Sequence, residues 1–225
     1  MNKKKIKKDK TMNKTNDLLI QRGKLLQEFA ENIPTLTDRM RLLLKENDCG
    51  WIDAYIYVND EEKLCINMSD VYNPFEDIKT WLEEIVKHRF ACIGSGVNID
   101  CEGYHIVMYY EPLFHTTDQQ MFGGADLTGL FYVYDSYDKK IVCKAYVKMK
   151  DLVELFYKTI LSYAETMVKQ DESFVDDWIL PMAGEHKEEE EEKAIQETYN
   201  RLFVSELIEK FLDNERSDKR FEKIK

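Results

Sequence analysis

The sequence lacks a long apolar run and a recognisable export signal. No window approaches the roughly 18 consecutive apolar residues that a membrane-spanning helix requires, so we expect no membrane association. Six lysines occur in residues 1–10, but polar residues 11–17 follow where a signal peptide would carry its apolar segment. Met12 is a second candidate start of translation, which would leave the lysine run as an extension. The sequence therefore predicts a cytoplasmic protein.

A pairing pattern among the cysteines is also missing. The chain has five cysteines and no CxxC pair; they are Cys49, Cys65, Cys92, Cys101 and Cys143. This usage is typical of a reducing compartment. Free cysteine is commonly buried and inert, so we interpret these residues as small apolar members of strands or their neighbours. A nucleophilic cysteine is the alternative.

No short motif for catalysis or for metal binding is present. The four histidines are far apart and none belongs to an HExxH pair; they are His88, His105, His115 and His186. The Gly94–Gly96 segment lacks the GKS/T ending of a phosphate loop, and no serine lies in a GxSxG elbow. We therefore predict no catalytic residue, no metal site and no cofactor. A hydrolase whose site is assembled only in the fold stays an alternative.

Positive charge is scarce outside the N-terminal region. The chain has 32 Lys/Arg and 43 Asp/Glu, a net charge of −11. Residues 1–50 contain 12 Lys/Arg against 7 Asp/Glu, a net of +5, so the remaining 175 residues carry −16. Such an acidic body repels phosphate backbones, and we expect no specific nucleic-acid binding. It favours a basic protein partner; the alternative is that the charge only maintains solubility.

Apolar residues, at 44% of 225, are abundant enough for one large core without a disulfide or metal. Residues 1–14 predict a basic disordered tail, and residues 15–180 a single domain. Asn16 and Asp17 can cap a first helix, which Pro34 prevents from continuing. A second helix is predicted over Thr37–Gly50, and we expect the two to form a helical hairpin.

Six later segments alternate in polarity and predict strands: Trp51–Val58, Leu64–Met68, Val97–Asp100, Tyr104–Glu111, Leu130–Asp135 and Ile141–Lys148. Asn73, Pro74 and Glu76 suit the N-cap, N1 and N3 positions of a helix that follows the second strand. We expect an α+β fold in which an antiparallel sheet of five or six strands packs against this helix and a helix over Met149–Gln170. The glycine-containing stretch 118–128 suggests a lid.

The last third of the sequence is helical in pattern. Phe174–Leu180 predicts a short helix, and residues 181–192 predict an acidic linker. Residues 193–225 predict a C-terminal helical extension in which Tyr199 and Phe203 lie on one apolar face. That face needs a cover, which is either the preceding domain or a second subunit in a homodimer.

Tyrosines concentrate on two of the predicted strands. Residues two apart on a strand share a face, so each strand presents two adjacent rings, and two carboxylates accompany the second pair. The predicted partner-binding residues are Tyr55, Tyr57, Tyr132, Tyr134, Asp135 and Asp138. Tyrosine is favoured at protein interfaces because it combines a broad ring with a polar tip. If the two hairpins are neighbours, the rings form one surface; the alternative is burial beneath the terminal helices.

The layout of residues 51–148 combines a hairpin, a Pro-started helix with the segment NPFEDIKTWLEEI, a turn within IDCEGY, and further hairpins. This layout resembles small bacterial cytosolic α+β proteins of the toxin-immunity type. Such proteins neutralise a partner toxin by binding it, without catalysis. The resemblance implies a non-enzymatic protein-binding module, an immunity-type inhibitor of a basic partner. A structural or oligomeric protein is a further alternative.

Overall fold

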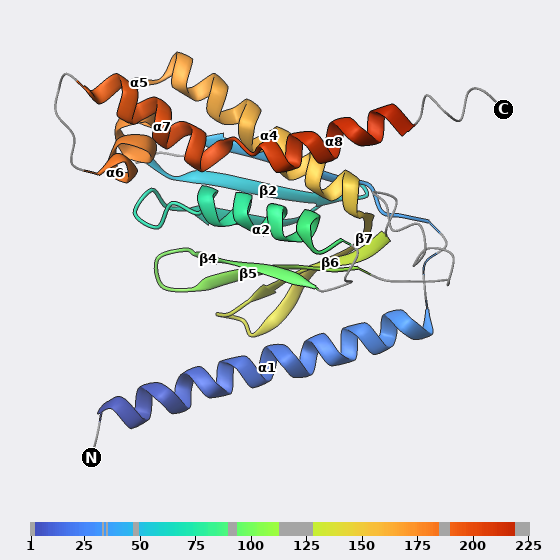
Figure 1. Ribbon diagram of the computed structural model, residues 1–225. Helices are drawn as coiled ribbons and strands as arrows, with labels where there is room; N and C mark the ends of the chain where they lie inside the picture. Colours follow the sequence, from blue (N-terminus) through green and yellow to red (C-terminus); the bar gives the residue numbers. More distant parts are fainter. Residues whose placement is uncertain are drawn as a thin grey trace.

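The computed structural model describes residues 3–32, 34, 36–46, 50–89, 94–112, 128–184 and 190–218. Side chains are described from Asp17 to Asp213 within these ranges. The suggested lid, apart from Thr128, lies outside them, as do Cys49, Cys92, His115 and His186. The fold is α+β, as expected, with helices on both sides of the strands (Figure 1).

The strands form two antiparallel sheets, which corrects the single sheet of five or six strands. Sheet A has the order β1-β2-β3 and consists of β1 (Met40–Glu46), β2 (Ile52–Val58) and β3 (Glu61–Met68). Sheet B has the order β4-β5-β6-β7 and consists of β4 (Ser95–Asp100), β5 (His105–Pro112), β6 (Thr128–Asp135) and β7 (Lys140–Lys148). Helix α2 (Phe75–Lys87) carries the chain from β3 to β4, the edge strand of sheet B opposite β7.

Strand β1 replaces the second helix that was predicted over Thr37–Gly50, so the helical hairpin was wrong. Leu42 and Leu44 pack toward the core, while Arg41 and Leu43 point outward. The run MRLLLKE fits a period of two as well as a helical period. Pairing with β2 along the whole of β1 decides between them.

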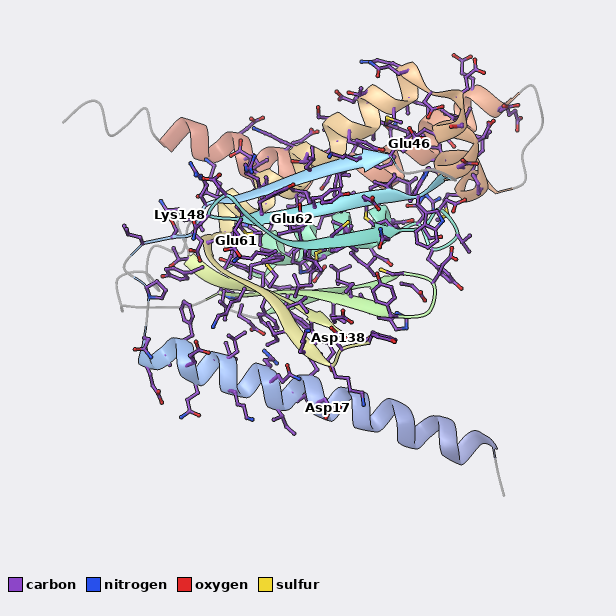
Figure 2. All side chains as sticks on the ribbon, turned by 180° about the vertical axis from the view of Figure 1, so that it is seen from behind. Asp17, Glu46, Glu61, Glu62, Asp138 and Lys148 are labelled. Carbon is purple, nitrogen blue, oxygen red and sulfur yellow. The ribbon has the colours of Figure 1, made fainter. Side chains whose placement is uncertain are left out.

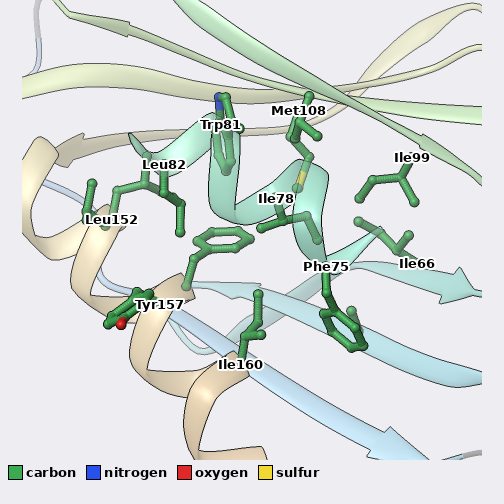
Figure 3. Packing of buried hydrophobic residues seen from close by; sticks show 14 of the residues in the cluster. Ile66, Phe75, Ile78, Trp81, Leu82, Ile99, Met108, Leu152, Tyr157 and Ile160 are labelled. Atoms are coloured by element: carbon green, nitrogen blue, oxygen red, sulfur yellow. The ribbon is translucent and has the colours of Figure 1, made fainter. Parts of the chain in front are cut away.

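The inner faces of both sheets share one core with α2 and α4 (Met149–Gln170). Pro74 is the N-cap of α2, one position later than predicted, and Asn73 Oδ1 accepts a hydrogen bond from the amide of Phe75 at 3.2 Å just before the helix. The Trp81 ring lies edge-on to Phe156 with centroids 5.7 Å apart, and its indole donates to the Ser95 carbonyl at 3.0 Å. Figure 3 shows how closely the side chains of α2, α4 and the strands interlock here.

Further helical segments complete the C-terminal part: α5 (Glu172–Phe174), η2 (Val175–Ile179), α6 (Leu180–Ala183), α7 (Glu191–Phe203) and α8 (Glu206–Asp218). The predicted terminal helix is broken at Val204, whose backbone is extended, and the Ser205 hydroxyl then caps α8 by accepting from the amide of Ile208 at 3.3 Å. Leu202 and Phe203 are buried in the core of the same chain. This apolar face is therefore covered by the domain of the same chain, which is one of the two alternatives expected from the sequence.

Helix α1 (Lys3–Glu31) lies along the outer face of sheet B, on the opposite side of the molecule from α7 and α8 (Figure 1). It begins at Lys3, within the stretch predicted as a disordered tail. Its residue Leu25 packs with Leu130 and Tyr132 of β6 in a small apolar cluster, separate from the main core. Strand β6 at the centre of sheet B is therefore covered on both faces.

Candidate interaction surfaces

The four predicted tyrosines do not form one surface. Tyr55 and Tyr57 lie on the outer face of sheet A, at intermediate exposure. Tyr132 and Tyr134 belong to sheet B and are only 0% and 3% exposed. The outward placement of this second pair was wrong, because Leu25 of α1 packs on the Tyr132 ring.

The two predicted carboxylates shape the turn between β6 and β7. Asp135 Oδ1 accepts from the amides of Tyr137 at 2.7 Å and Asp138 at 3.2 Å. Asp138 forms an ion pair of 2.9 Å with Lys140. Figure 2 shows Asp138 on the α1 side of the molecule, apart from Glu62 of sheet A. These carboxylates therefore do not adjoin the exposed tyrosine pair.

The outer face of sheet A carries an ordered aromatic surface. Its residues are Arg41, Leu43, Lys45, Asp53, Tyr55, Tyr57, Cys65 and Asn67. The Arg41 guanidinium lies 4.7 Å from the centroid of the Tyr57 ring, and the Lys45 ammonium lies 5.2 Å from that of Tyr55. At these distances a cation is attracted to the ring face. Both rings are thus held in place by the neighbouring strand β1.

Hydrogen bonds fix the polar ends of the same rings. The Tyr57 hydroxyl donates to Glu62 at 3.1 Å, and the Tyr55 hydroxyl donates to Asp53 at 3.3 Å. The proximity of Cys65, together with desolvation and Asp53, raises the pKa of Tyr55 to about 12. Both phenols therefore remain protonated donors at neutral pH. Leu43, directly opposite Tyr55 in the register, adds an apolar side chain that is 41% exposed.

A buried carboxylate anchors α1 to sheet B. Glu111 of β5 is only 7% exposed, and its Oε1 accepts from Arg22 Nε at 2.7 Å and from the Tyr132 hydroxyl at 3.2 Å. The hydrogen bond with Glu111 raises the pKa of Arg22, and burial raises the pKa of Tyr132. The ring of Tyr109 stacks on Tyr132 with centroids 5.2 Å apart. Because this cluster is enclosed by α1, we interpret it as an anchor rather than as a reactive site.

A groove of about 720 Å³ opens between α1, strand β7 and the β2–β3 hairpin. We call it the β7 groove; its polar lining includes Lys24, Lys63 and Lys144. Cys143 also lines it, but burial raises the pKa of that thiol to about 12, so it is not a thiolate at neutral pH. Within its described lining, the groove therefore holds no activated cysteine.

The described histidines lie apart from this groove. His105 Nδ1 is 3.8 Å from Asp100 at the start of β5, and His88 Nε2 is 3.0 Å from Glu84 at the end of α2. Within the described ranges no three His, Cys, Asp or Glu residues are grouped to hold a metal ion. Among the same residues no helix combines the length and apolar character needed to cross a membrane.

Two sets of surface residues escaped the sequence-based prediction. Arg41, Leu43 and Lys45 were assigned to a helix, although their spacing of two along MRLLLKE was the available signal. Lys63 and Lys144 carried no signal, because only the fold brings β3 and β7 to the same groove. Both sets lie on edge strands, namely β1, β3 and β7, whose neighbours are decided by long-range packing.

Comparison with known proteins gives no assignment. No family model, curated protein or solved structure matches the chain. The function is therefore inferred from the surfaces of the molecule itself.

Proposed function

We propose that the chain is a non-enzymatic protein-binding module whose contact surface is the outer face of sheet A. The observation that carries this proposal is the fixed pair Tyr55 and Tyr57 on a face that no described helix covers. Tyrosine and arginine are enriched among the residues that dominate binding energy. Because the rings are already held by cations and hydrogen bonds, ordering them on binding costs little conformational entropy.

The charge of the chain supports a basic partner and an immunity-type inhibitory role. The net charge is −11, and exposed Glu61 and Glu62 at the start of β3 adjoin the outer face of sheet A, which itself carries Arg41, Lys45 and Asp53. Negative potential around a binding face accelerates encounter with a positive partner and repels a negative one. An inhibitor of this kind acts by covering the site of its partner, so it needs no catalytic group of its own.

The alternatives have less support. For a hydrolase, the described histidines lie outside the β7 groove and the Cys143 thiol is held neutral. For an oligomer built through the C-terminal helices, Leu202, Phe203 and Ile208 are already buried within the same chain. No contact in the described residues favours either role over protein binding.

The test is affinity capture from cells that produce the chain, followed by measurement with purified components. A partner identified by mass spectrometry is purified, and its Kd is determined by calorimetry for wild type, Tyr57→Ala and Tyr137→Ala. Tyr57→Ala should weaken binding about tenfold or more, as expected for an interface aromatic. Tyr137 is 79% exposed at the β6–β7 turn, so truncating it is the matched control and should change little.

Inhibition is tested separately from binding. If the partner is toxic to cells, co-production of the wild-type chain should restore growth, and Tyr57→Ala should restore it less. Equal affinity of wild type and Tyr57→Ala for the purified partner would refute the assignment of the surface. A captured partner with a net negative charge would refute the electrostatic part.

A further inference from the structure

The β7 groove has the dimensions of a binding site. Its volume of about 720 Å³ lies within the range of roughly 300–1,000 Å³ found for ligand pockets. By contrast, the gap at the centre of the main core is about 10 Å³. The groove is lined on one side by Leu25 and Phe29 of α1 and on the other by Asn59 and Lys63 of the β2–β3 hairpin. It is separate from the outer face of sheet A and does not rest on the proposed function.

The groove runs beside two edge strands. Strand β7 is the last strand of sheet B and β3 the last of sheet A, and no ladder joins them in the part of the chain that is described. An edge strand presents N–H and C=O groups that lack a partner strand. Because β3 also contacts β7, an added strand would not insert between them but would pair with the part of the β7 edge that borders the groove.

The chain itself supplies such bonds at both ends of the β7 edge. At one end, Gln21 of α1 accepts from the amide of Ile141 at 3.0 Å and donates to the carbonyl of Lys139. At the other end, the Asp38 amide donates to the Tyr146 carbonyl at 2.7 Å, and Asp38 Oδ2 accepts from the Tyr146 amide at 2.8 Å. Gln21 and Asp38 thus each bond one backbone N–H and one backbone C=O of the β7 edge, as a paired strand would.

Between these two ends, Lys144 directs its backbone groups toward the groove. Alternate residues of an antiparallel strand point their N–H and C=O groups to the same side. The groups of Tyr146 point away from β6 toward Asp38, so those of Lys144, two residues earlier, point the same way. Lys144 therefore offers one donor and one acceptor to a ligand in the groove.

The side chains of the groove select an acidic ligand with apolar residues. Leu25, Phe29 and Ile141 provide an apolar strip, whereas Lys24, Lys63 and Lys144 provide positive charge. Glu28 forms an ion pair of 2.8 Å with Lys144, and Lys63 pairs with Glu61 beside the groove. The Asp38 carboxylate accepts from Asn59 and from the Tyr146 amide. The lining thus has three lysines against two carboxylates, Glu28 and Asp38, in a chain whose net charge is −11.

We propose that the β7 groove binds an extended acidic peptide segment of a partner protein, which pairs with β7 at Lys144 as an added strand. An extended peptide has side chains that alternate between two faces. Its apolar residues meet the strip on α1, and its carboxylates meet the lysines. Backbone pairing supplies affinity, and this alternation supplies specificity.

The first experiment measures charge and sequence preference. The probe is a fluorescein-labelled, end-capped peptide of alternating valine and glutamate, and its counterpart alternates valine and lysine. Fluorescence anisotropy should show saturable binding of the glutamate peptide, and binding of the lysine peptide about tenfold weaker or less. The double variant Lys24→Glu/Lys63→Glu should lose about tenfold in affinity. The control Lys158→Glu/Lys210→Glu has the same charge change on α4 and α8, away from the groove, and should bind nearly as wild type (Figure 1).

The second experiment tests the backbone contact. Lys144→Ala and Lys144→Pro both remove the ammonium group, but only proline removes the amide N–H. Because this amide points away from β6, proline is tolerated there without loss of a ladder hydrogen bond. Lys144→Pro should bind the glutamate peptide several-fold more weakly than Lys144→Ala. If circular dichroism shows that the proline variant is unfolded, amide exchange at Lys144 in the wild-type chain replaces it, and the peptide should slow that exchange.

Several results would overturn the proposal. They are equal affinity for the glutamate and lysine peptides, no effect of the groove charge reversal, and unchanged exchange at Lys144 on peptide binding. Palmitate that displaces the peptide while leaving Lys144 exchange unchanged would identify the groove as a site for anionic lipids instead. None of these variants replaces a residue of the outer face of sheet A, and the Lys144 variants also leave the neighbouring Glu61 and its partner Lys63 unchanged, so failure here leaves the proposed function standing.

Discussion

Replacement of Tyr132 by alanine tests whether α1 is an integral part of the fold. The Tyr132 ring is 0% exposed, stacks on Tyr109 and packs on Leu25 of α1. Truncating a buried large aromatic costs about 3–5 kcal/mol, since apolar burial is lost and a cavity remains. We expect a loss of about 3 kcal/mol, at the lower end, because α1 can move toward β6 and fill part of the space.

The variant Tyr132→Phe separates packing from hydrogen bonding. It keeps the ring and removes only the hydroxyl that donates to Glu111 at 3.2 Å. Arg22 still holds the Glu111 carboxylate at 2.7 Å, so no buried charge is left alone. The expected loss is about 1 kcal/mol, the usual net contribution of one hydrogen bond. The ratio of the two losses therefore reports how much of the contact is apolar.

Urea unfolding followed by tryptophan fluorescence measures both free energies, and limited trypsin digestion reports on the docking of α1. Tyr132→Ala should accelerate cleavage within α1, whereas Tyr137→Ala, which truncates an exposed tyrosine of the next turn, should change stability by less than about 0.5 kcal/mol. A loss below about 1 kcal/mol for Tyr132→Ala, with cleavage of α1 as in wild type, would show that α1 does not cover this ring.

Three further predictions concern the core, the C-terminal helices and a buried thiol. Trp81→Ala should lower the free energy of unfolding in urea by about 3 kcal/mol or more, and a loss below about 1 kcal/mol would contradict its burial at 2% exposure. Ser205→Ala removes the cap of α8 and a hydrogen bond of 2.7 Å to Glu83, so it should cost about 1–2 kcal/mol and speed amide exchange in α8; unchanged exchange would argue against the cap. Burial raises the pKa of Cys143 from 9.0 to about 12, so the stability due to its neutral thiol is present below pH 9 and is lost as the pH rises toward 12. Covalent labelling of the thiols at pH 8, with the labelled sites located by peptide mapping, should therefore be much slower at Cys143 in the native chain than in urea. Equal labelling rates in the two states would refute the burial of Cys143.

The strands that could be predicted from the sequence are those with local signals. β2 and β3 alternate in polarity on either side of Asn59 and Asp60, both of which adopt positive φ, 52° and 68°, as a tight hairpin turn requires. Helix α2 is similarly marked by Asn73 at its start. β1 has no such mark, and its Leu-rich run is assigned only by pairing with β2. The number of sheets was not predictable either, because adjacency of β3 and β7 depends on where α2 carries the chain.

The sequence does contain a signal for the difference in exposure between the two tyrosine pairs. Along β2, Tyr55 and Tyr57 share their face with Asp53, as is typical of a strand with one solvated face. Along β6, the run from Leu130 to Tyr134 contains no charged residue, and every side chain in it is buried. Such a continuous apolar run indicates a strand covered on both faces.

The sequence of β6 thus indicates a cover on its outer face, but it does not identify that cover. The selection depends on Glu111 of β5, a carboxylate that would be costly to bury without a positive partner. Arg22 supplies that charge, and Leu25, three residues later on the same side of α1, supplies the apolar contact to Tyr132. Because both requirements meet only once β5 and β6 are paired, the docking of α1 is specified by the assembled sheet rather than by any single segment of the chain.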